Sequence, residues 1–293
     1  MVLYQQGDTT VRGTYGDSIS NWCVGNLDNL AEVFADQTGF NEPLSGWDVS
    51  RVTNMNGLFR GAIRFNQDLS SWDTSSVETM TQTFSKAYSF NGDVSTWNVG
   101  RVSRMNQMFS ECGSFNNDVS GWDVREVTDM REMFRQAYAF NQNLASWDVI
   151  NLSSTDGLFD EASNFNQGIF RPAKVFNMNR MFRKATSFNQ EGVSTWDVST
   201  VYFMESMFEE ASSFSQDLSL WDVRSVTTMA RMFYNAGSFS ADLCAWGSPL
   251  SPSANVAEAF ALTSCSETRD PDMQAIPPGP FCEMCPSLIR NRG

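Results

Sequence analysis

Histidine is absent from this chain of 293 residues. Histidine is the usual general base in enzymes, activates many serine and cysteine nucleophiles, and is the commonest metal ligand. Its absence removes many hydrolases and metalloenzymes from consideration. We therefore expect a protein that is not an enzyme and that needs no cofactor.

Basic residues and long apolar runs are also scarce. There are 20 Lys and Arg against 34 Asp and Glu, a formal net charge of -14, which disfavours contact with phosphate backbones and anionic lipids. No apolar run approaches the ~20 residues that a membrane-spanning helix needs. We expect neither nucleic-acid binding nor membrane insertion. Residues 1–8 do not resemble a signal peptide, so a secreted location requires a processed or partial form.

Aromatic residues recur with a fixed period. The tryptophans lie 25 residues apart with one interval of 49, at Trp22, Trp47, Trp72, Trp97, Trp122, Trp147, Trp196, Trp221 and Trp246. Phenylalanines keep nearly the same spacing in two columns that begin at Phe34 and Phe40. A period between about 20 and 50 residues indicates a repeat architecture.

Two shorter hydrophobic patterns alternate within each repeat. In residues 50–62, apolar side chains recur at steps of three and four from Val52 to Ala62, which predicts one face of a helix. In residues 44–49, tryptophan and valine lie two apart, which predicts a short strand with Asp48 on its opposite face. The sequence thus predicts an α/β solenoid of about ten strand-helix coils with a parallel sheet on its concave face.

The array has defined limits. We expect an N-terminal segment over residues 1–15, the repeat solenoid over residues 16–263, and a cysteine-bearing C-terminal cap and tail over residues 264–293. Atypical coils at both ends are expected, because a terminal coil has no neighbour to cover its core.

The repeat resembles a known family. Its L-x-x-W-x-V segment is similar to the leucine-rich-repeat strand L-x-x-L-x-L, and the full unit, as in Phe65 through Asp73 and Phe214 through Val223, resembles that of BspA-like leucine-rich-repeat surface proteins. That family includes a mycoplasma lipoprotein repeat and secreted algal proteins. The resemblance implies a right-handed leucine-rich-repeat-like solenoid that serves in adhesion or recognition at the cell surface. The tail resembles the cysteine-bearing cap of the algal members.

Six cysteines are present, and four lie near the C-terminal end. Cys23 and Cys112 stand apart, and Cys112 occupies a column otherwise held by alanine, which predicts a small buried thiol. The remaining four are disulfide candidates with three alternative pairings, at Cys244, Cys265, Cys282 and Cys285. A four-thiolate zinc site is the weaker alternative, because only one C-x-x-C pair is present.

Acidic residues form two columns. The first lies between the tryptophan and valine of each repeat and supplies the candidate binding residues Asp48, Asp73, Asn98, Asp123, Asp148, Asp197 and Asp222. A second comprises Asp68, Asp93, Asp118, Asp217 and Asp242. These carboxylates either bind a partner, with calcium as a less favoured ligand, or accept hydrogen bonds from the backbone of the following turn. The tryptophan column is interpreted as core packing. So is a column of methionines, at Met55, Met80, Met105, Met130, Met178, Met204 and Met229.

One coil departs from the pattern. Proline at position 172 replaces the expected tryptophan, and five basic residues gather nearby, at Arg171, Lys174, Arg180, Arg183 and Lys184. Two interpretations remain open: a basic notch that docks a partner, or a degenerate repeat with a local kink.

These observations lead to one functional expectation. We expect an extracellular or cell-surface protein-binding or adhesion scaffold, which recognises a protein or a wall or matrix component through the acidic concave face. The alternative is a structural subunit of a larger surface or wall assembly.

Overall fold

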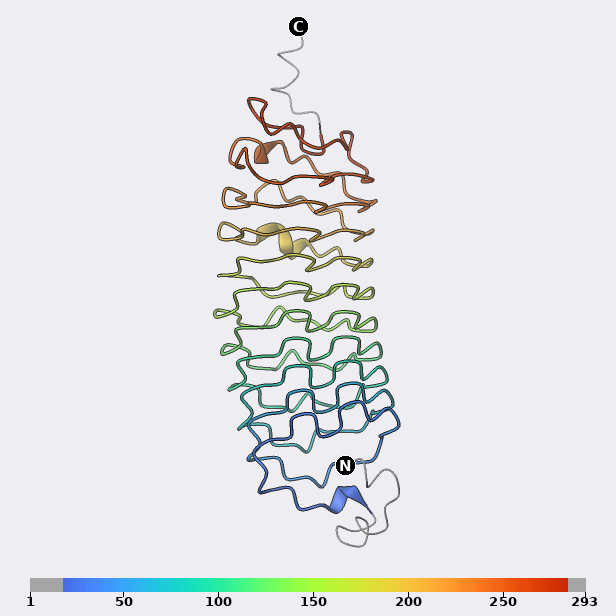
Figure 1. The fold of residues 1–293 in the computed structure, drawn as a ribbon. Helices are drawn as coiled ribbons and strands as arrows, with labels where there is room; N and C mark the ends of the chain where they lie inside the picture. The colour runs from blue at the N-terminus through green and yellow to red at the C-terminus, as the bar shows by residue number, and fades with distance from the viewer. Residues whose placement is uncertain (1–17, 284–293) are drawn as a thin grey trace.

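The structure is a computed structural model that describes residues 18–283 and stacks them as a column of coils (Figure 1). Single parallel β-bridges join adjacent coils, in one run through Asn29, Asn54, Thr79, Arg104 and Asp129 and in another through Ser154, Asn177, Phe203, Thr228 and Asn255. Bridged residues lie about one repeat apart, so adjacent coils run in the same direction. The predicted repeat architecture is therefore confirmed.

The backbone alternates between two kinds of hydrogen bond. The amides of Met55, Gly57 and Phe59 donate to the carbonyl oxygens of residues 79, 81 and 83 in the next coil, at 2.7 to 3.0 Å. The amides in between close tight turns within the coil, as Leu58 does on Met55 at 3.2 Å. Each coil is thus a chain of turns bonded to its neighbour.

The predicted helices and strands are wrong. Within residues 18–283 the regular elements are three short 3₁₀ helices, η1 (Ile19–Asn21), η2 (Glu191–Thr195) and η3 (Cys244–Trp246), with no α-helix and no strand longer than a bridge. The predicted α/β class and the predicted parallel sheet on a concave face are therefore wrong as well. Successive three-residue turns bury side chains at steps of three and four, as a helix does, so the hydrophobic pattern did not separate the two.

Left-handed backbone positions break any helix. Gly57 and Gly61 have φ values of +59° and +70°. The equivalent positions in the next coil are Gln82 and Lys86, with φ values of +57° and +62°. A non-glycine residue in this conformation costs about 1 to 2 kcal/mol, so the hydrogen bonds to both neighbouring coils must hold it there.

Stacked aromatic rings fill the interior. Phe59 lies with its ring centroid 3.9 Å from that of Phe65 in the same coil and 5.4 Å from that of Phe84 in the next. Trp72 stacks on Trp97 at 6.1 Å. The tryptophans from residue 47 onward and the methionine column are buried. Their predicted role in core packing is confirmed.

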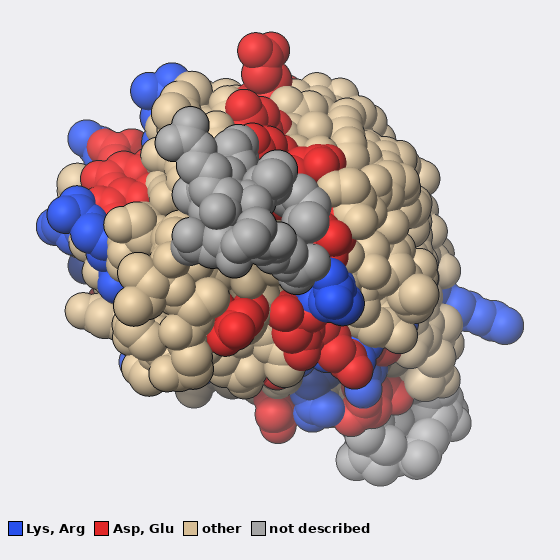
Figure 2. Space-filling model, turned by 90° about the horizontal axis from the view of Figure 1, so that it is seen from above, with Lys and Arg blue, Asp and Glu red and all other residues tan. Residues whose placement is uncertain are grey.

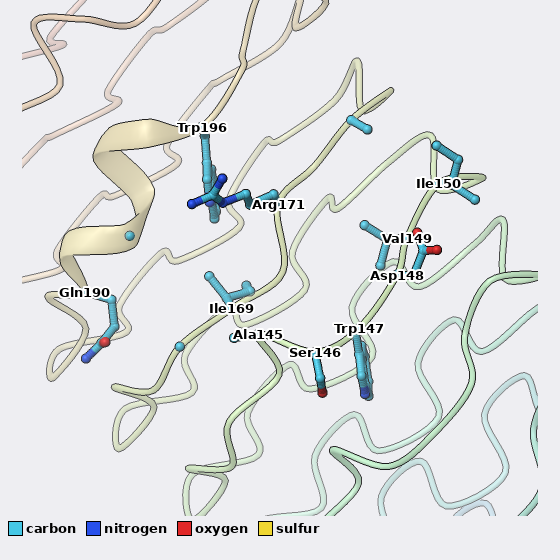
Figure 3. Close-up of a pocket in the computed structure, with 13 residues that line it drawn as sticks. Ala145, Ser146, Trp147, Asp148, Val149, Ile150, Ile169, Arg171, Gln190 and Trp196 are labelled. Atoms are coloured by element: carbon cyan, nitrogen blue, oxygen red, sulfur yellow. The ribbon is translucent and has the colours of Figure 1, made fainter.

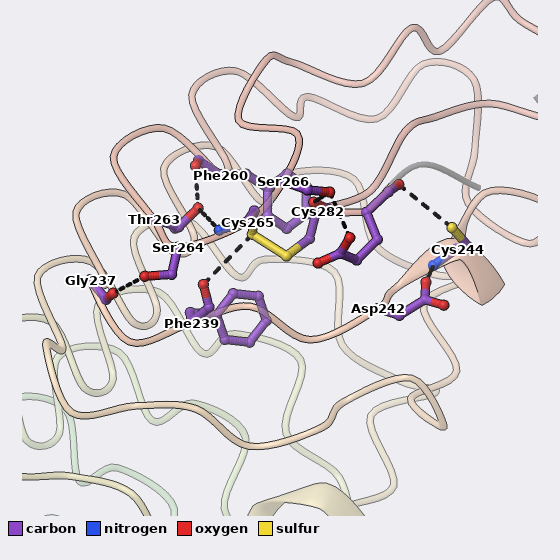
Figure 4. Close-up of a disulfide and its surroundings, with 11 residues drawn as sticks. Gly237, Phe239, Asp242, Cys244, Phe260, Thr263, Ser264, Cys265, Ser266 and Cys282 are labelled. Carbon is purple, nitrogen blue, oxygen red and sulfur yellow. Dashed lines mark hydrogen bonds between the residues drawn. A yellow bond between two sulfur atoms is a disulfide. The ribbon is translucent and has the colours of Figure 1, made fainter.

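A disulfide-linked segment covers the last coil. Cys265 and Cys282 are joined by a disulfide (Figure 4), and the amide of Leu243 donates to the carbonyl of Phe281 at 3.4 Å. Phe281 is fully buried, with its ring edge-on to Phe260 at 6.3 Å. This segment shields the aromatic core at the C-terminal end of the column.

Candidate interaction surface

The first acidic column is braced by its own turns. Asp48 is exposed between two buried residues, and its Oδ1 accepts hydrogen bonds from the amide of Ser50 at 3.1 Å and from the Ser50 hydroxyl at 2.7 Å. Asp73 and Asp197 are bound in the same way by the serine two residues on. These hydrogen bonds, the one from the serine side chain first, lower the pKa of all three carboxyls.

Other members of the column differ in charge. Asp123 pairs with Arg125, whose Nη2 lies 2.6 Å from Oδ2, and Asp222 pairs with Arg224 in the same manner. Asn98 accepts the amide of Gly100 at 3.1 Å without a charge. The members of the column therefore share one turn geometry, but the net charge at each position differs.

Asp148 is the exception in this column. It is exposed, and its carboxylate has no hydrogen bond and no ion pair with any residue between 18 and 283. Both of its oxygens are open to a ligand.

The second acidic column has a structural role throughout. Each carboxylate accepts the backbone amide two residues on at 2.8 to 2.9 Å, as Asp68 does from Ser70. A neighbouring row of asparagines links coils, and Asn41 accepts the amide of Asn66 at 2.8 Å. Within the described residues, no group of three or more Cys, Asp or Glu side chains is arranged to hold a metal ion. These hydrogen bonds favour the structural interpretation, in which the carboxylates of the second column hold the backbone of the following turn.

The five predicted basic residues lie in two environments. Arg183, Arg180 and Lys184 are ion-paired with acids of the preceding coil: Arg183 Nε lies 2.8 Å from Asp160 and Arg180 Nη2 lies 2.9 Å from Asp156. Arg171 and Lys174 are exposed and make no ion pair in the part of the chain that the structure describes. Only these two present an uncompensated charge.

A pocket opens where the tryptophan column is interrupted (Figure 3). Its volume is about 590 Å³, and Trp147 and Trp196 lie on opposite sides of it. Arg171 is also part of its lining. Asp148, Ile169 and Gln190 also line it. Sequence reasoning missed this pocket, although the interval of 49 between two tryptophans marks the place.

The cysteines agree in part with their predicted roles. Cys265 and Cys282 form a disulfide, which selects among the three pairings; Cys285 lies outside the described residues. Cys244 is disulfide-bonded as well. Cys112 is a free, fully buried thiol as predicted, and burial raises its pKa. Cys23 is a free, exposed thiol.

Charged side chains cover only part of the surface. A view along the column shows acidic and basic groups intermingled at one side and along the lower edge, while much of the opposite flank carries neither (Figure 2). Among residues 18–283, no helix has the length and apolar character to cross a bilayer.

Comparison with known proteins places the chain in a family. No curated protein matches it. The family model described as Mycoplasma protein of unknown function, DUF285, matches three successive segments, residues 8–112, 92–172 and 170–268. These segments span most of the chain and contain the aromatic columns. The protein therefore belongs to the DUF285 repeat family.

Proposed function

We propose that this protein is a non-enzymatic binding scaffold, secreted or displayed at the cell surface, that recognises a protein or wall component through the face carrying the first acidic column. The observation that carries this proposal is the geometry of Asp48, Asp73 and Asp197. Each is exposed, and each has one carboxylate oxygen fixed by the following serine. Preorganised charges lose little conformational freedom on binding, and they suit a basic partner.

Two further features support this location and role. The repeat resembles that of BspA-like leucine-rich-repeat surface proteins, which are associated with adhesion. The Cys265–Cys282 disulfide is typical of proteins in oxidising compartments.

A structural subunit of a wall assembly is the second candidate. The regular stacking of coils favours it, since a column of identical spacing can pack side by side with copies of itself. The cap that buries Phe281 covers the C-terminal coil, so such packing would use the flanks of the column.

The test is a charge-removing variant that keeps the turns. Asn98 shows that asparagine holds the same hydrogen bond in this column, so we design Asp48→Asn, Asp73→Asn and Asp197→Asn together. The matched control is Asp68→Asn, Asp93→Asn and Asp118→Asn, which removes equal charge from the second column. Labelled protein is then applied to intact cells and isolated wall material of the source organism, with and without a calcium chelator.

Each outcome has a meaning. We expect the wild type and the control to bind and the first variant to lose at least tenfold in affinity. Loss in both variants would indicate unspecific electrostatic attraction. Equal binding by all three would reduce the first column to a structural role. Absence of wild-type binding, with side-by-side association in solution, would favour the assembly subunit.

A further inference from the structure

The ladder of hydrogen bonds between coils is broken at one step. Parallel bridges join the other adjacent coils of the described chain, but none joins Asp129 to Ser154. The amides of Met130 and Ser153 stand at the positions that donate across the ladder at the other steps, at 2.8 to 3.0 Å. Neither amide donates to a backbone carbonyl of residues 18–283. Backbone N–H groups require a partner, so this step leaves hydrogen-bonding capacity for a ligand or for water.

A pocket lies at the broken step, and its charges are compensated. Its volume is about 310 Å³, and its lining includes Asp129, Arg131 and Asp156. Arg131 Nη2 lies 2.8 Å from Asp129 Oδ2, and Arg180 Nη2 lies 2.9 Å from Asp156 Oδ1. Each carboxylate of the lining therefore has an arginine beside it. Complementarity of charge favours a neutral ligand.

Two polar side chains of the lining have open groups. The hydroxyl of Ser153 makes no hydrogen bond with the described part of the chain. Asn177 is held through its Oδ1, which accepts the amide of Asn179 at 2.9 Å, and its Nδ2 donates to no residue between 18 and 283. A hydroxyl both donates and accepts, and an amide NH₂ donates twice. These groups suit a ligand that is rich in hydroxyls.

An aromatic strip, formed by Phe176, Tyr202 and Phe203, continues from this pocket. These side chains are 38% to 47% exposed, and Phe176 also lines the pocket. The amide of Tyr202 donates to the carbonyl of Phe176 at 2.9 Å, and Phe203 forms the bridge with Asn177. The rings of Tyr202 and Phe203 have centroids 6.3 Å apart.

The strip is an exception within its rows. The equivalent positions in the other coils hold polar residues, such as Thr128 and Asp129. Adjacent exposed aromatic side chains in otherwise polar rows mark an interaction site.

An aromatic surface beside open hydroxyl and amide groups selects a chemical class. The C–H face of a sugar ring can pack on an aromatic ring, while the hydroxyls at its rim exchange hydrogen bonds with polar groups. An apolar peptide would leave those polar groups unpaired. The pocket is at the lower end of the usual range of about 300 to 1,000 Å³ for small ligands. From the pocket to the end of the strip is three coil steps, or ~14 Å at ~4.8 Å per step, which is the length of a short oligosaccharide.

We propose that the pocket and the aromatic strip bind a neutral β-glucan chain. One sugar ring packs on Phe176 with its hydroxyls on Ser153 and Asn177, and the next rings lie along Tyr202 and Phe203. Glucose suits this surface because its equatorial hydroxyls leave both faces of the ring to C–H groups. The site uses no residue of the first acidic column, so either proposal can fail without the other.

The experiment titrates the full chain with cellotetraose and with laminaritetraose by calorimetry. We expect saturable binding of at least one of them, and at least tenfold weaker binding by Phe176→Ala and by Tyr202→Ala. The matched control is Tyr138→Ala, because Tyr138 is as exposed as Tyr202, at 47%, but lies outside the strip. Its affinity should stay within twofold of the wild type. Thermal unfolding of each variant checks that the column remains folded.

Two further variants separate stacking from hydrogen bonding. Phe176→Tyr keeps the ring and should bind within about threefold of the wild type. Ser153→Ala removes one open hydroxyl and should weaken binding about three- to tenfold, as expected for one hydrogen bond. Full binding by Phe176→Ala would contradict the stacking of a sugar on this ring.

Several results would overturn the proposal. Absence of saturation up to millimolar concentrations of both tetrasaccharides would reject the site, and equal losses in Tyr138→Ala and Tyr202→Ala would show that the strip is not the surface bound. Equally tight binding of digalacturonate would show that a neutral ligand is not selected. Binding of a decaproline peptide in place of the glucans would indicate a protein ligand. Self-association that Tyr202→Ala abolishes, without glucan binding, would make the strip an interface between copies.

Discussion

Asp160 and Arg183 lie on adjacent coils and form an ion pair with two hydrogen bonds. Arg183 Nε is 2.8 Å from Asp160 Oδ1, and Nη2 is 2.8 Å from Oδ2. Asp160 is 1% exposed, and Arg135 Nε lies 3.8 Å from its Oδ2. Burial raises the pKa of Asp160, and this outweighs the lowering by Arg183. Asp160 is therefore a buried carboxylate whose charged form depends on Arg183.

Loss of one partner should be strongly destabilising. We expect Arg183→Met to lower the free energy of unfolding by about 3 kcal/mol, because it leaves a buried carboxylate without its main counter-charge. The double variant Asp160→Leu with Arg183→Met should recover most of this loss, since no buried charge remains. Urea unfolding measures both. The control Arg101→Met removes an exposed arginine 3.8 Å from Glu78 and should change nothing measurable. A stable Arg183→Met variant would contradict the pair's importance.

Acid should act in opposite directions on the two kinds of aspartate. The lowered pKa values of Asp48, Asp73 and Asp197 mean that their stabilisation is present above the ordinary value of about 3.9 and is lost as the pH falls through the folded-state values. The raised pKa of Asp160 means that its contribution is present at low pH and is lost as the pH rises. Both effects concern the acidic range.

Urea unfolding between pH 6 and pH 2 separates these effects. The variant with asparagine at positions 48, 73 and 197 should lose stability less steeply on acidification than the wild type. Asp160→Asn should lose it more steeply, because its compensating protonation is gone. Parallel curves for all three proteins would refute the assignment.

The tryptophan hydrogen bond can be measured with two matched variants. Trp72 donates to the carbonyl of Leu44 at 3.0 Å, whereas Trp196 has no acceptor in the described residues. Both rings stack on the next tryptophan, at 6.1 and 6.4 Å. Trp72→Phe should therefore destabilise by about 0.5 to 1.5 kcal/mol more than Trp196→Phe, because it removes one buried hydrogen bond while the Leu44 carbonyl keeps the one from the amide of Trp47. Equal losses in thermal unfolding would show that the bond contributes little.

Left-handed positions should tolerate alanine poorly. Gly57→Ala places a side chain at φ +59°, and we expect a loss of about 1 kcal/mol in the free energy of unfolding. The control is Gly39→Ala, where an added Cβ has no atom within 4 Å and φ is ordinary. It should be neutral or stabilising by up to about 1 kcal/mol, because alanine restricts the unfolded chain. Chemical denaturation compares the two, and a larger loss at Gly39 would be inconsistent with this account.

Removal of the cap disulfide should loosen the C-terminal coil. Cys265 and Cys282 close a loop with a sequence separation of 17, and loss of such a crosslink costs about 3 kcal/mol in the chain-entropy model. We expect Cys265→Ser with Cys282→Ser to expose Phe281 and to speed proteolysis after the last coil. Hydrogen exchange should rise in residues 264–283 and stay unchanged near Cys112, in the middle of the column. Unchanged exchange in the cap would show that packing alone holds it.

Much of the interior was predictable from residue spacing. The period of 25, the burial of Trp47 and its equivalents, and the buried thiol of Cys112 all follow from columns of identical residue type. Among the site residues, the exposed position of Asp48 and its hydrogen bond to the following turn were also expected. The buried partnership of Arg183 was not, because an arginine near an exposed-looking stretch gives no signal of an aspartate 23 residues earlier.

The sequence alone determined which side chains face the core, because burial requires only that apolar residues recur at a regular interval. It did not determine the backbone path, since turns and helices place apolar residues at the same steps. Only the tertiary structure decided that Met55 and Gly57 donate to the next coil and that Trp196 lacks an acceptor. The physical reason is that hydrogen-bond partners are chosen across coils, a full repeat away along the chain, where local patterns carry no information.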